Sequence, residues 1–74
     1  MIGKRLCTAR KKMNLTLTEV AERMNVSHTT ISRYESGKRK ADPDTLITLC
    51  KLYNVSANYI LGLPKDMPYP ENEE

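Results

Sequence analysis

The sequence predicts an all-α domain of five short helices around one core. Apolar residues recur every three to four positions in successive segments, which is the period of a helix with one buried face. Three similar triplets separate these segments: Asn-Leu-Thr at 14–16, and Asn-Val-Ser at 25–27 and 54–56. No segment alternates apolar and polar residues over several positions, so strands are not expected.

The triplets are interpreted as joints between helices. Asn tolerates the left-handed conformation that ends a helix, the apolar residue after it turns into the core, and Ser or Thr caps the next helix. Each triplet also matches the N-x-[ST] glycosylation sequon, which requires secretion. The basic, amphipathic start of the sequence does not resemble a secretion signal. The helix joint is therefore the preferred interpretation.

Two helices flank the first joint. The first spans about residues 2–13 and is expected to bury Ile2, Leu6, Ala9 and Met13. The second begins after Thr16, which forms a capping box with Glu19. Its expected inner residues are Val20, Ala21 and Met24. The small side chain of Ala21 would let another helix approach closely.

The third helix is predicted to run from the cap Ser27 to residue 35 or 36, where Gly37 ends it. At about 100° per residue, Ile31 and Tyr34 point to one side. The opposite side carries His28, Thr29, Ser32, Arg33 and Ser36. Such short hydroxyl side chains beside His and Arg can donate and accept hydrogen bonds at base-pair edges in a major groove. A solvated surface that is rich in Ser and Thr is the alternative.

The fourth helix opens with Asp42 as cap and Pro43 in its first turn. Its inner residues are Leu46, Leu49, Cys50 and Tyr53. A short fifth helix follows Ser56 and ends at Gly62. Residues 1–63 then form the domain, and residues 64–74, which contain three prolines, are expected to be a disordered acidic tail or linker.

The composition favours a binding module over an enzyme. A chain of 74 residues holds one small core. It has one histidine and no nucleophile–base pair or Gly-rich phosphate loop, so no enzyme and no cofactor are predicted. Cys7 and Cys50 are far apart and are expected to be reduced thiols, with no metal site. No apolar run is long enough for a membrane span, and no small-molecule ligand is indicated.

Charge is unevenly distributed along the chain. The net charge is +3, but residues 1–40 carry ten Lys and Arg against three Glu, and residues 64–74 carry one Lys against four acidic residues. A basic body favours a polyanionic partner. An ordinary solvated surface is the alternative.

Taken together, residues 2–62 resemble the lambda-repressor-like helix-turn-helix family of Cro and XRE-type phage and bacterial regulators. The resemblance is carried by RLCTARKKMNLT, LTEVAERMNVSHTTISRYESGKRK and DTLITLCKLYNVSANYILGL. It implies a cytoplasmic, nucleoid-associated regulator, more often a repressor in this family, that binds a pseudo-palindromic double-stranded DNA operator as a homodimer. Helices two and three would form the helix-turn-helix, with helix 28–35 in the major groove.

The resemblance also implies roles for individual residues. Base contacts fall to His28, Thr29, Ser32 and Arg33. Phosphate contacts fall to Thr16, Leu17, Thr18, Ser27, Lys38, Arg39 and Lys40, with further contacts from the backbone just after Gly37. Arg10 and Glu35 occupy positions that often form an ion pair in the family. Dimer contacts fall to Asn58, Tyr59 and Leu61.

Two positions depart from the family pattern. Leu17 replaces a Gln that usually contacts a phosphate, so Thr16 or Thr18 would have to supply that contact. Ala41 replaces a frequent Pro, and a Pro stands at position 43 instead. The alternative function is a protein-interaction module of the same fold without operator binding, which the acidic tail and Leu17 would suit.

Overall fold

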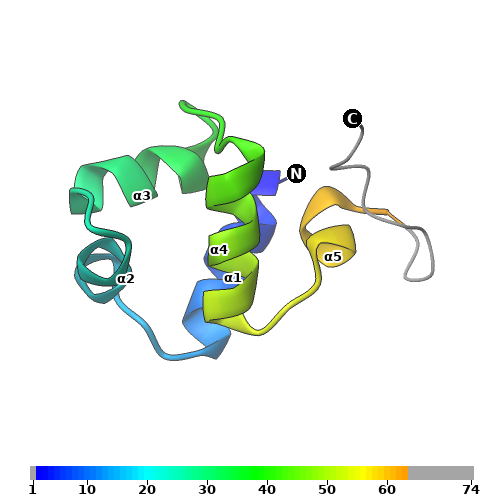
Figure 1. Ribbon diagram of the computed structural model, residues 1–74, viewed down its shortest axis with the longest axis horizontal. Coiled ribbons are helices and arrows are strands. Elements are labelled where there is room, and N and C mark those ends of the chain that lie inside the picture. Colours follow the sequence, from blue (N-terminus) through cyan, green and yellow to red (C-terminus); the bar gives the residue numbers. More distant parts are fainter. Residues whose placement is uncertain (1, 64–74) are drawn as a thin grey trace.

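The computed structural model describes residues 2–63, which form five helices, as the sequence predicts. They are α1 (Ile2–Lys12), α2 (Leu17–Met24), α3 (His28–Ser36), α4 (Pro43–Tyr53) and α5 (Ala57–Leu61). Figure 1 shows α2 and α3 at one end of the molecule and α5 at the other, with α1 and α4 between them. The tail predicted at 64–74 lies outside the described residues.

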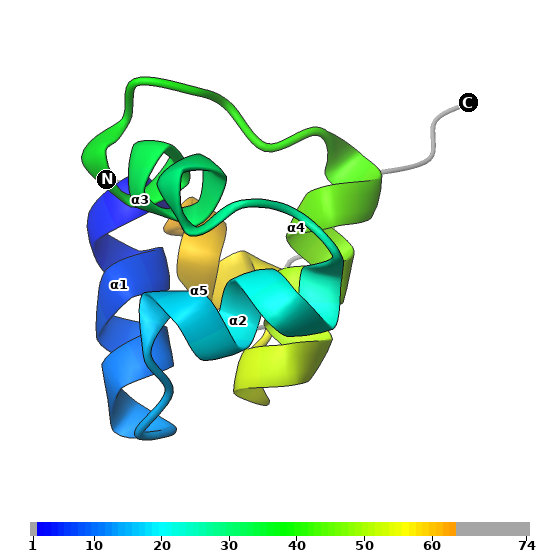
Figure 2. The ribbon, with the colours of Figure 1, turned by 90° about the vertical axis from the view of Figure 1, so that its left-hand side faces the viewer.

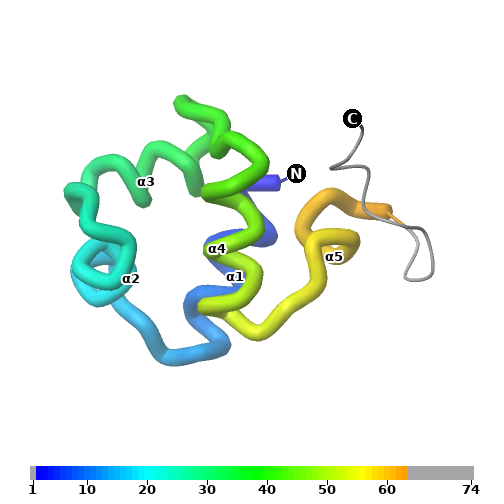
Figure 3. The backbone as a smooth tube through the Cα atoms, viewed as in Figure 1, coloured from blue at the N-terminus to red at the C-terminus, as the bar shows by residue number. Residues whose placement is uncertain are grey.

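All three joints have the expected local geometry. Asn14, Asn25 and Asn54 have φ angles of 57°, 58° and 56°. The hydroxyl of Ser27 accepts a hydrogen bond from the N–H of Thr30, and that of Ser56 accepts one from the N–H of Tyr59. The path of the joint from α2 into α3 is visible in Figure 3. The joints follow from local chemistry, because each bond closes within three residues.

The core draws one or more residues from every helix. Its members are Leu6, Ala9, Val20, Ala21, Ile31, Tyr34, Leu46, Leu49, Cys50, Tyr53 and Ile60. α1 packs against α3, α4 and α5, and α2 packs against α3. In Figure 2, α2 crosses in front of α1 and α4, and α3 lies above it, seen nearly along its axis. α3 is therefore held on one side by its neighbours and open on the other.

Three apolar residues are not buried as expected. Ile2 at the start of α1 and Met13 just after its end are 46% and 43% exposed. The buried residues of α1 are Leu6, Ala9 and Arg10, on the side where α1 packs against α3, α4 and α5. Val26 is 41% exposed, so it does not turn into the core at its joint.

Candidate DNA interface

α3 is fixed through its inner side. Ile31 and Tyr34 are the buried residues of this helix, and Val20 and Ala21 of α2 belong to the same core. The opposite side carries His28, Thr29, Ser32 and Arg33, all of them exposed. We call these four residues the outward face. The division between inner and outward residues follows the helical period read from the sequence.

The start of α3 is capped by side chains that leave donors pointing outward. Ser27 Oγ accepts from the N–H of Thr30 at 3.3 Å and shares a hydrogen bond of 3.0 Å with the Thr30 hydroxyl. In an α-helix, the N–H groups of the first residues have no partner within the helix. The N–H groups of His28 and Thr29 are of this kind, and together with the positive end of the helix dipole they favour an anion.

The start of α2 lies beside the start of α3. Thr16 and Glu19 form the predicted capping box, with bonds of 2.8 and 3.1 Å. Leu17, Thr18 and His28 all line one shallow hollow of about 540 Å³, which also touches the end of α1. The structure thus brings the first turns of both helices onto one surface. Leu17 has an apolar, half-buried side chain, so only its backbone N–H is suited to a phosphate.

Arg10 links α1, the first joint and α3. Its Nε donates to Glu35 Oε2 at 2.7 Å and its Nη2 donates to Glu35 Oε1 at 3.1 Å. Its Nη1 donates to the carbonyl oxygen of Leu15 at 2.8 Å. The hydrogen bond to Glu35 raises the pKa of Arg10, and burial opposes it. Both charges are largely buried, so the pair fixes the end of α3 relative to α1.

The segment 38–40, here called the basic turn, follows the end of α3. Gly37 adopts the left-handed conformation with φ 83°, and Lys38, Arg39 and Lys40 are all exposed. The backbone N–H groups of Lys38 and Arg39 both donate to the carbonyl oxygen of Arg33, at 3.0 and 3.3 Å. The expectation that the backbone just after Gly37 contacts phosphate is therefore wrong for these two groups, because helix termination already uses them.

The side chains of the basic turn point to different surroundings. The guanidinium of Arg39 lies 5.8 Å from the ring centroid of Tyr34, within the range of a cation–π contact. Arg39 and Lys40 line a groove on the side of α1 and α4, and Lys38 is not among its lining residues. Lys38 is thus the member of the turn that this groove does not engage.

Gly3 lies at a close approach between α1 and the end of α3. A Cβ atom added there would lie 2.8 Å from the carbonyl oxygen of Tyr34 and closer still to that of Glu35. These are backbone atoms and cannot rotate away. Gly3 therefore allows α1 to meet the end of α3. A lone glycine near a helix start gives no sequence signal for this, because the partner lies more than 30 residues away.

The predicted dimer residues differ in exposure. Tyr59 is 41% exposed, Leu61 is half-buried, and Asn58 is buried at 9% exposure. α5 turns Asn58 toward the molecule as it packs on α1 and α4, so Tyr59 offers the largest exposed side chain for the predicted dimer contact. All three lie at the end of the molecule opposite α3 (Figure 1).

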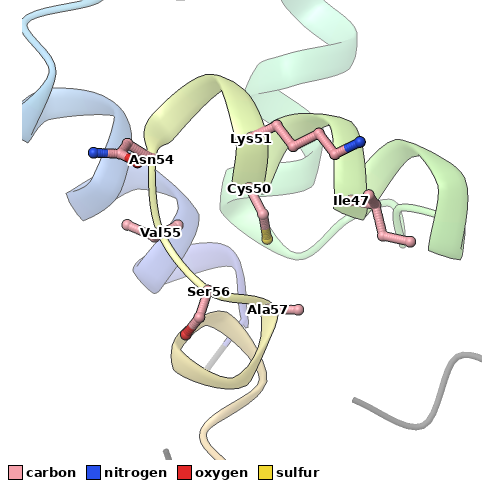
Figure 4. Close-up of a pocket in the computed structure, with 7 residues that line it drawn as sticks. All are labelled: Ile47, Cys50, Lys51, Asn54, Val55, Ser56 and Ala57. Atoms are coloured by element: carbon pink, nitrogen blue, oxygen red, sulfur yellow. The ribbon is translucent and has the colours of Figure 1, made fainter. Parts of the chain in front are cut away.

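A second hollow lies between α4 and α5. Figure 4 shows its seven lining residues, which come from α4, the joint 54–56 and the first residue of α5. Cys50 lines it, and burial raises the pKa of this thiol, so the thiol stays protonated near neutral pH. None of the residues predicted to read bases lines this hollow.

Two features are absent from the part of the chain that the structure describes. Among residues 2–63, no cluster of three or more His, Cys, Asp or Glu is placed to hold a metal ion. Over the same range, no helix has the length and apolar character needed to cross a membrane. Cys7 and Cys50 are both free thiols.

Comparison with known proteins agrees with this geometry. Residues 8–60 match the model of a helix-turn-helix family. The chain is 46% identical over 72 residues to the HTH-type transcriptional regulator ImmR of Bacillus subtilis, covering 97% of this chain and 55% of that protein. It is 38% identical over 73 residues to the uncharacterised HTH-type transcriptional regulator YobD of the same species, covering 99% and 64%.

A third relative has a different name. The antitoxin PezA of Streptococcus pneumoniae is 34% identical over 74 residues, covering 100% of this chain and 47% of that protein. The chain thus spans about half to two thirds of the length of these relatives. The similarity to them concerns the helix-turn-helix portion and the residues just after it.

Proposed function

The chain belongs to this helix-turn-helix family, of the Cro and XRE type, and we propose that it is a transcriptional regulator that reads double-stranded DNA through α3. The family is one of DNA-binding domains and not of enzymes, which agrees with the prediction made from the sequence. The observation that carries the proposal is the division of α3 into an anchored inner side and a polar outward face.

The dimensions and chemistry of α3 suit a major groove. With its side chains an α-helix is about 10–12 Å across, and the groove is about 12 Å wide. Arg33 would donate to guanine O6 and N7. Thr29 would contact a thymine methyl or a base edge, with His28 and Ser32 beside it. Fixed anchors at Ile31 and Tyr34 set the depth at which these side chains reach the bases.

Phosphate contacts are proposed at both ends of α3. At its start, Thr16 and Thr18 line one hollow with His28, and Ser27 caps α3 directly before His28. The N–H groups that helix geometry leaves open at the two helix starts would bind phosphate there. At its end, the exposed Lys38, which does not line the groove of Arg39 and Lys40, is the proposed contact to the backbone, with Arg39 and Lys40 next to it. Such contacts hold the protein in register, and the outward face supplies the specificity.

Repression through a two-fold symmetric operator is part of the proposal. A single α3 covers about half a turn of DNA, so two copies on adjacent half-sites would be needed for a specific site. The exposed ring of Tyr59 is the proposed contact between copies, with Leu61 next to it. The relatives named as transcriptional regulators support regulation, and repression follows the commoner behaviour of this family.

Selection of bound duplexes from a random library tests the proposal. A two-fold symmetric consensus is expected. Arg33→Ala should then lose about 1–3 kcal/mol of discrimination at one position per half-site, whereas Lys38→Ala should weaken all sequences alike and reduce the salt slope by about one. Lys51→Ala is the matched control, because this exposed lysine lies on α4 beside the second hollow.

The result that would overturn the proposal is also clear. Absence of binding to any duplex at low salt, with Lys51→Ala and the unmodified chain both folded, would favour the protein-interaction module. A steep salt slope without a sequence preference would leave only non-specific binding.

A further inference from the structure

An apolar groove lies next to the proposed DNA interface and shares only Arg39 and Lys40 with it. The groove has a volume of about 760 Å³ and is formed by the start of α1, the end of α3, the segment 37–41, the start of α4 and the end of α5. Its apolar lining includes Ile2, Leu6, Ala41, Pro43, Leu46 and Leu61. None of the four residues of the outward face lines it.

The groove leaves apolar surface in contact with water. Ile2, at its edge, is 46% exposed. Contiguous apolar surface with a polar border is typical of a binding site for another chain segment. The groove is therefore suited to an apolar side chain or two from a peptide.

The border of the groove is positively charged. Lys4, Arg39 and Lys40 line it, and Arg39 is held over the ring of Tyr34, which lines it too. Glu35 also lines the groove, but its carboxylate is paired with Arg10. A segment that carries carboxylates close to its apolar residues would match both properties.

Residues 64–74, PKDMPYPENEE, have this composition. Met67 and Tyr69 are their large apolar residues, and Glu71, Glu73 and Glu74 follow. The segment carries one Lys against four acidic residues, net −3, and residues 1–63 carry eleven Lys and Arg against five acidic residues, net +6. The two parts of the chain attract each other at low ionic strength.

The connection is short enough for the segment to reach the groove. Leu61, only three residues before position 64, already lines it. At no more than about 3.6 Å per residue, the chain from Leu63 covers up to about 14 Å to Met67 and up to about 29 Å to Glu71. Leu61 lines the same groove as Arg39 and Lys40, so these two cations are within range of the segment.

We propose that residues 64–74 bind this groove, with Met67 and Tyr69 on its apolar lining and the three glutamates opposite Arg39 and Lys40. The segment then competes with DNA phosphates for these two cations and lowers DNA affinity. This second consequence rests on the proposed function, whereas occupation of the groove does not.

Nuclear magnetic resonance of the full 74-residue chain tests the occupation. In Met67→Ser/Tyr69→Ser, the backbone amide signals of Gly3, Ala41 and Leu61 are expected to shift, and those of Glu22 and Arg23 on the exposed side of α2 are expected to stay. Asn72→Ser is the matched control within the segment and should leave the groove signals nearly unchanged. Unchanged groove signals in the double variant would overturn the proposal.

A change in the groove itself gives a second, independent test. Ile2→Ser and Met13→Ser alter two residues of nearly equal exposure at opposite ends of α1, and only Ile2 lines the groove. Ile2→Ser should shift the signals of Met67 and Tyr69, and Met13→Ser should not. Equal responses to both variants would contradict the proposal.

DNA titration tests the competition. If the segment occupies the groove about nine-tenths of the time, Met67→Ser/Tyr69→Ser should bind DNA about tenfold more tightly than the unmodified chain. The gain should shrink at high salt. Glu71→Gln/Glu73→Gln/Glu74→Gln should give a similar gain. A gain in the glutamine variant alone, without groove shifts in the serine variant, would mean general charge repulsion and overturn the docking.

The outcomes separate the two proposals. Groove shifts in a chain that binds no DNA would support the docking and contradict the proposed function. Groove signals that change with protein concentration but not with variants of the segment would identify a second copy as occupant, and would overturn the proposal.

Discussion

The joints at residues 25–27 and 54–56 have the same sequence, Asn-Val-Ser, and nearly the same local structure. In both, Asn is left-handed and the N–H of Val donates to a carbonyl five residues earlier, that of Ala21 or Cys50, at 3.0 Å. Their tertiary surroundings differ. Val26 is exposed, and Val55 is half-buried against the core. The same local sequence thus produces the same turn, and the packing around each turn decides how far its valine is buried.

The two joints also lead to different helices. The joint 25–27 precedes α3, whose first residues, His28 and Thr29, are exposed. The joint 54–56 precedes α5, which packs on α1 and α4. The joint at 14–16 adds a third case, because Arg10 donates to its Leu15 carbonyl and couples it to Glu35. The joint that precedes α2 is thus tied to the end of α3.

The largest effect on stability is expected from removing the contacts of Arg10 with Glu35 and with the Leu15 carbonyl. Arg10→Ala should lower the free energy of unfolding by about 2–4 kcal/mol, because it leaves Glu35 buried without its partner and removes the bond to the first joint. Lys11→Ala, its exposed neighbour, should stay within about 0.5 kcal/mol. Urea unfolding measures both. Equal midpoints for the two variants would show that the tie contributes nothing.

A smaller effect should separate the two valines. Val55→Ser should cost about 1–2 kcal/mol, since it removes apolar surface from a half-buried site, and Val26→Ser less than about 0.5 kcal/mol. Thermal unfolding of the two variants, side by side, measures the difference. If Val26→Ser were as damaging as Val55→Ser, the exposed position of Val26 would be wrong.

The N-caps Ser27 and Ser56 should contribute equally to stability, but only Ser27 should contribute to DNA binding. Ser27→Ala and Ser56→Ala each remove one N-cap hydroxyl and should each cost about 1 kcal/mol. Only Ser27→Ala should weaken DNA binding, by a factor of about three to ten, because Ser27 both orients the start of α3 and offers a phosphate contact. A similar loss of binding in Ser56→Ala, at a temperature where both are folded, would contradict this.

The smallest effect concerns pH at the first joint. The N–H and hydroxyl of Thr16 lower the pKa of Glu19, so the folded pKa lies below the unfolded one. The resulting stabilisation is present above the unfolded pKa and is lost as pH falls through the folded pKa. Three residues after the other two caps, the chain has Thr30 and Tyr59 where the first joint has Glu19. The stability of those two joints therefore has no pH dependence of this kind.

Glu19→Gln measures this contribution directly. The unmodified chain should be slightly more stable than the variant at pH 6, and the difference should decrease by pH 3. Asp42, whose pKa is lowered by hydrogen bonds from Thr45, is common to both chains and cancels in the difference. A difference that grows toward low pH would mean that the sign of the Glu19 shift is wrong.

The interface was only partly predictable. The outward face follows from helical period and from Ile31 and Tyr34 as anchors, which are properties of one segment. The apolar groove and the closeness of the α2 and α3 starts depend on how helices pack. Gly3 was missed for the same reason, since its role exists only once α1 meets the carbonyls of Tyr34 and Glu35.

The sequence by itself determined the five helices, their caps and their joints, because those bonds close within about five residues and need no distant partner. Only the tertiary structure decided which of two identical valines is half-buried, that Asn58 turns inward, and that Gly3 meets the carbonyls at the end of α3. Burial and close approach are properties of several segments at once. They arise from the packing of α1 against α3, α4 and α5.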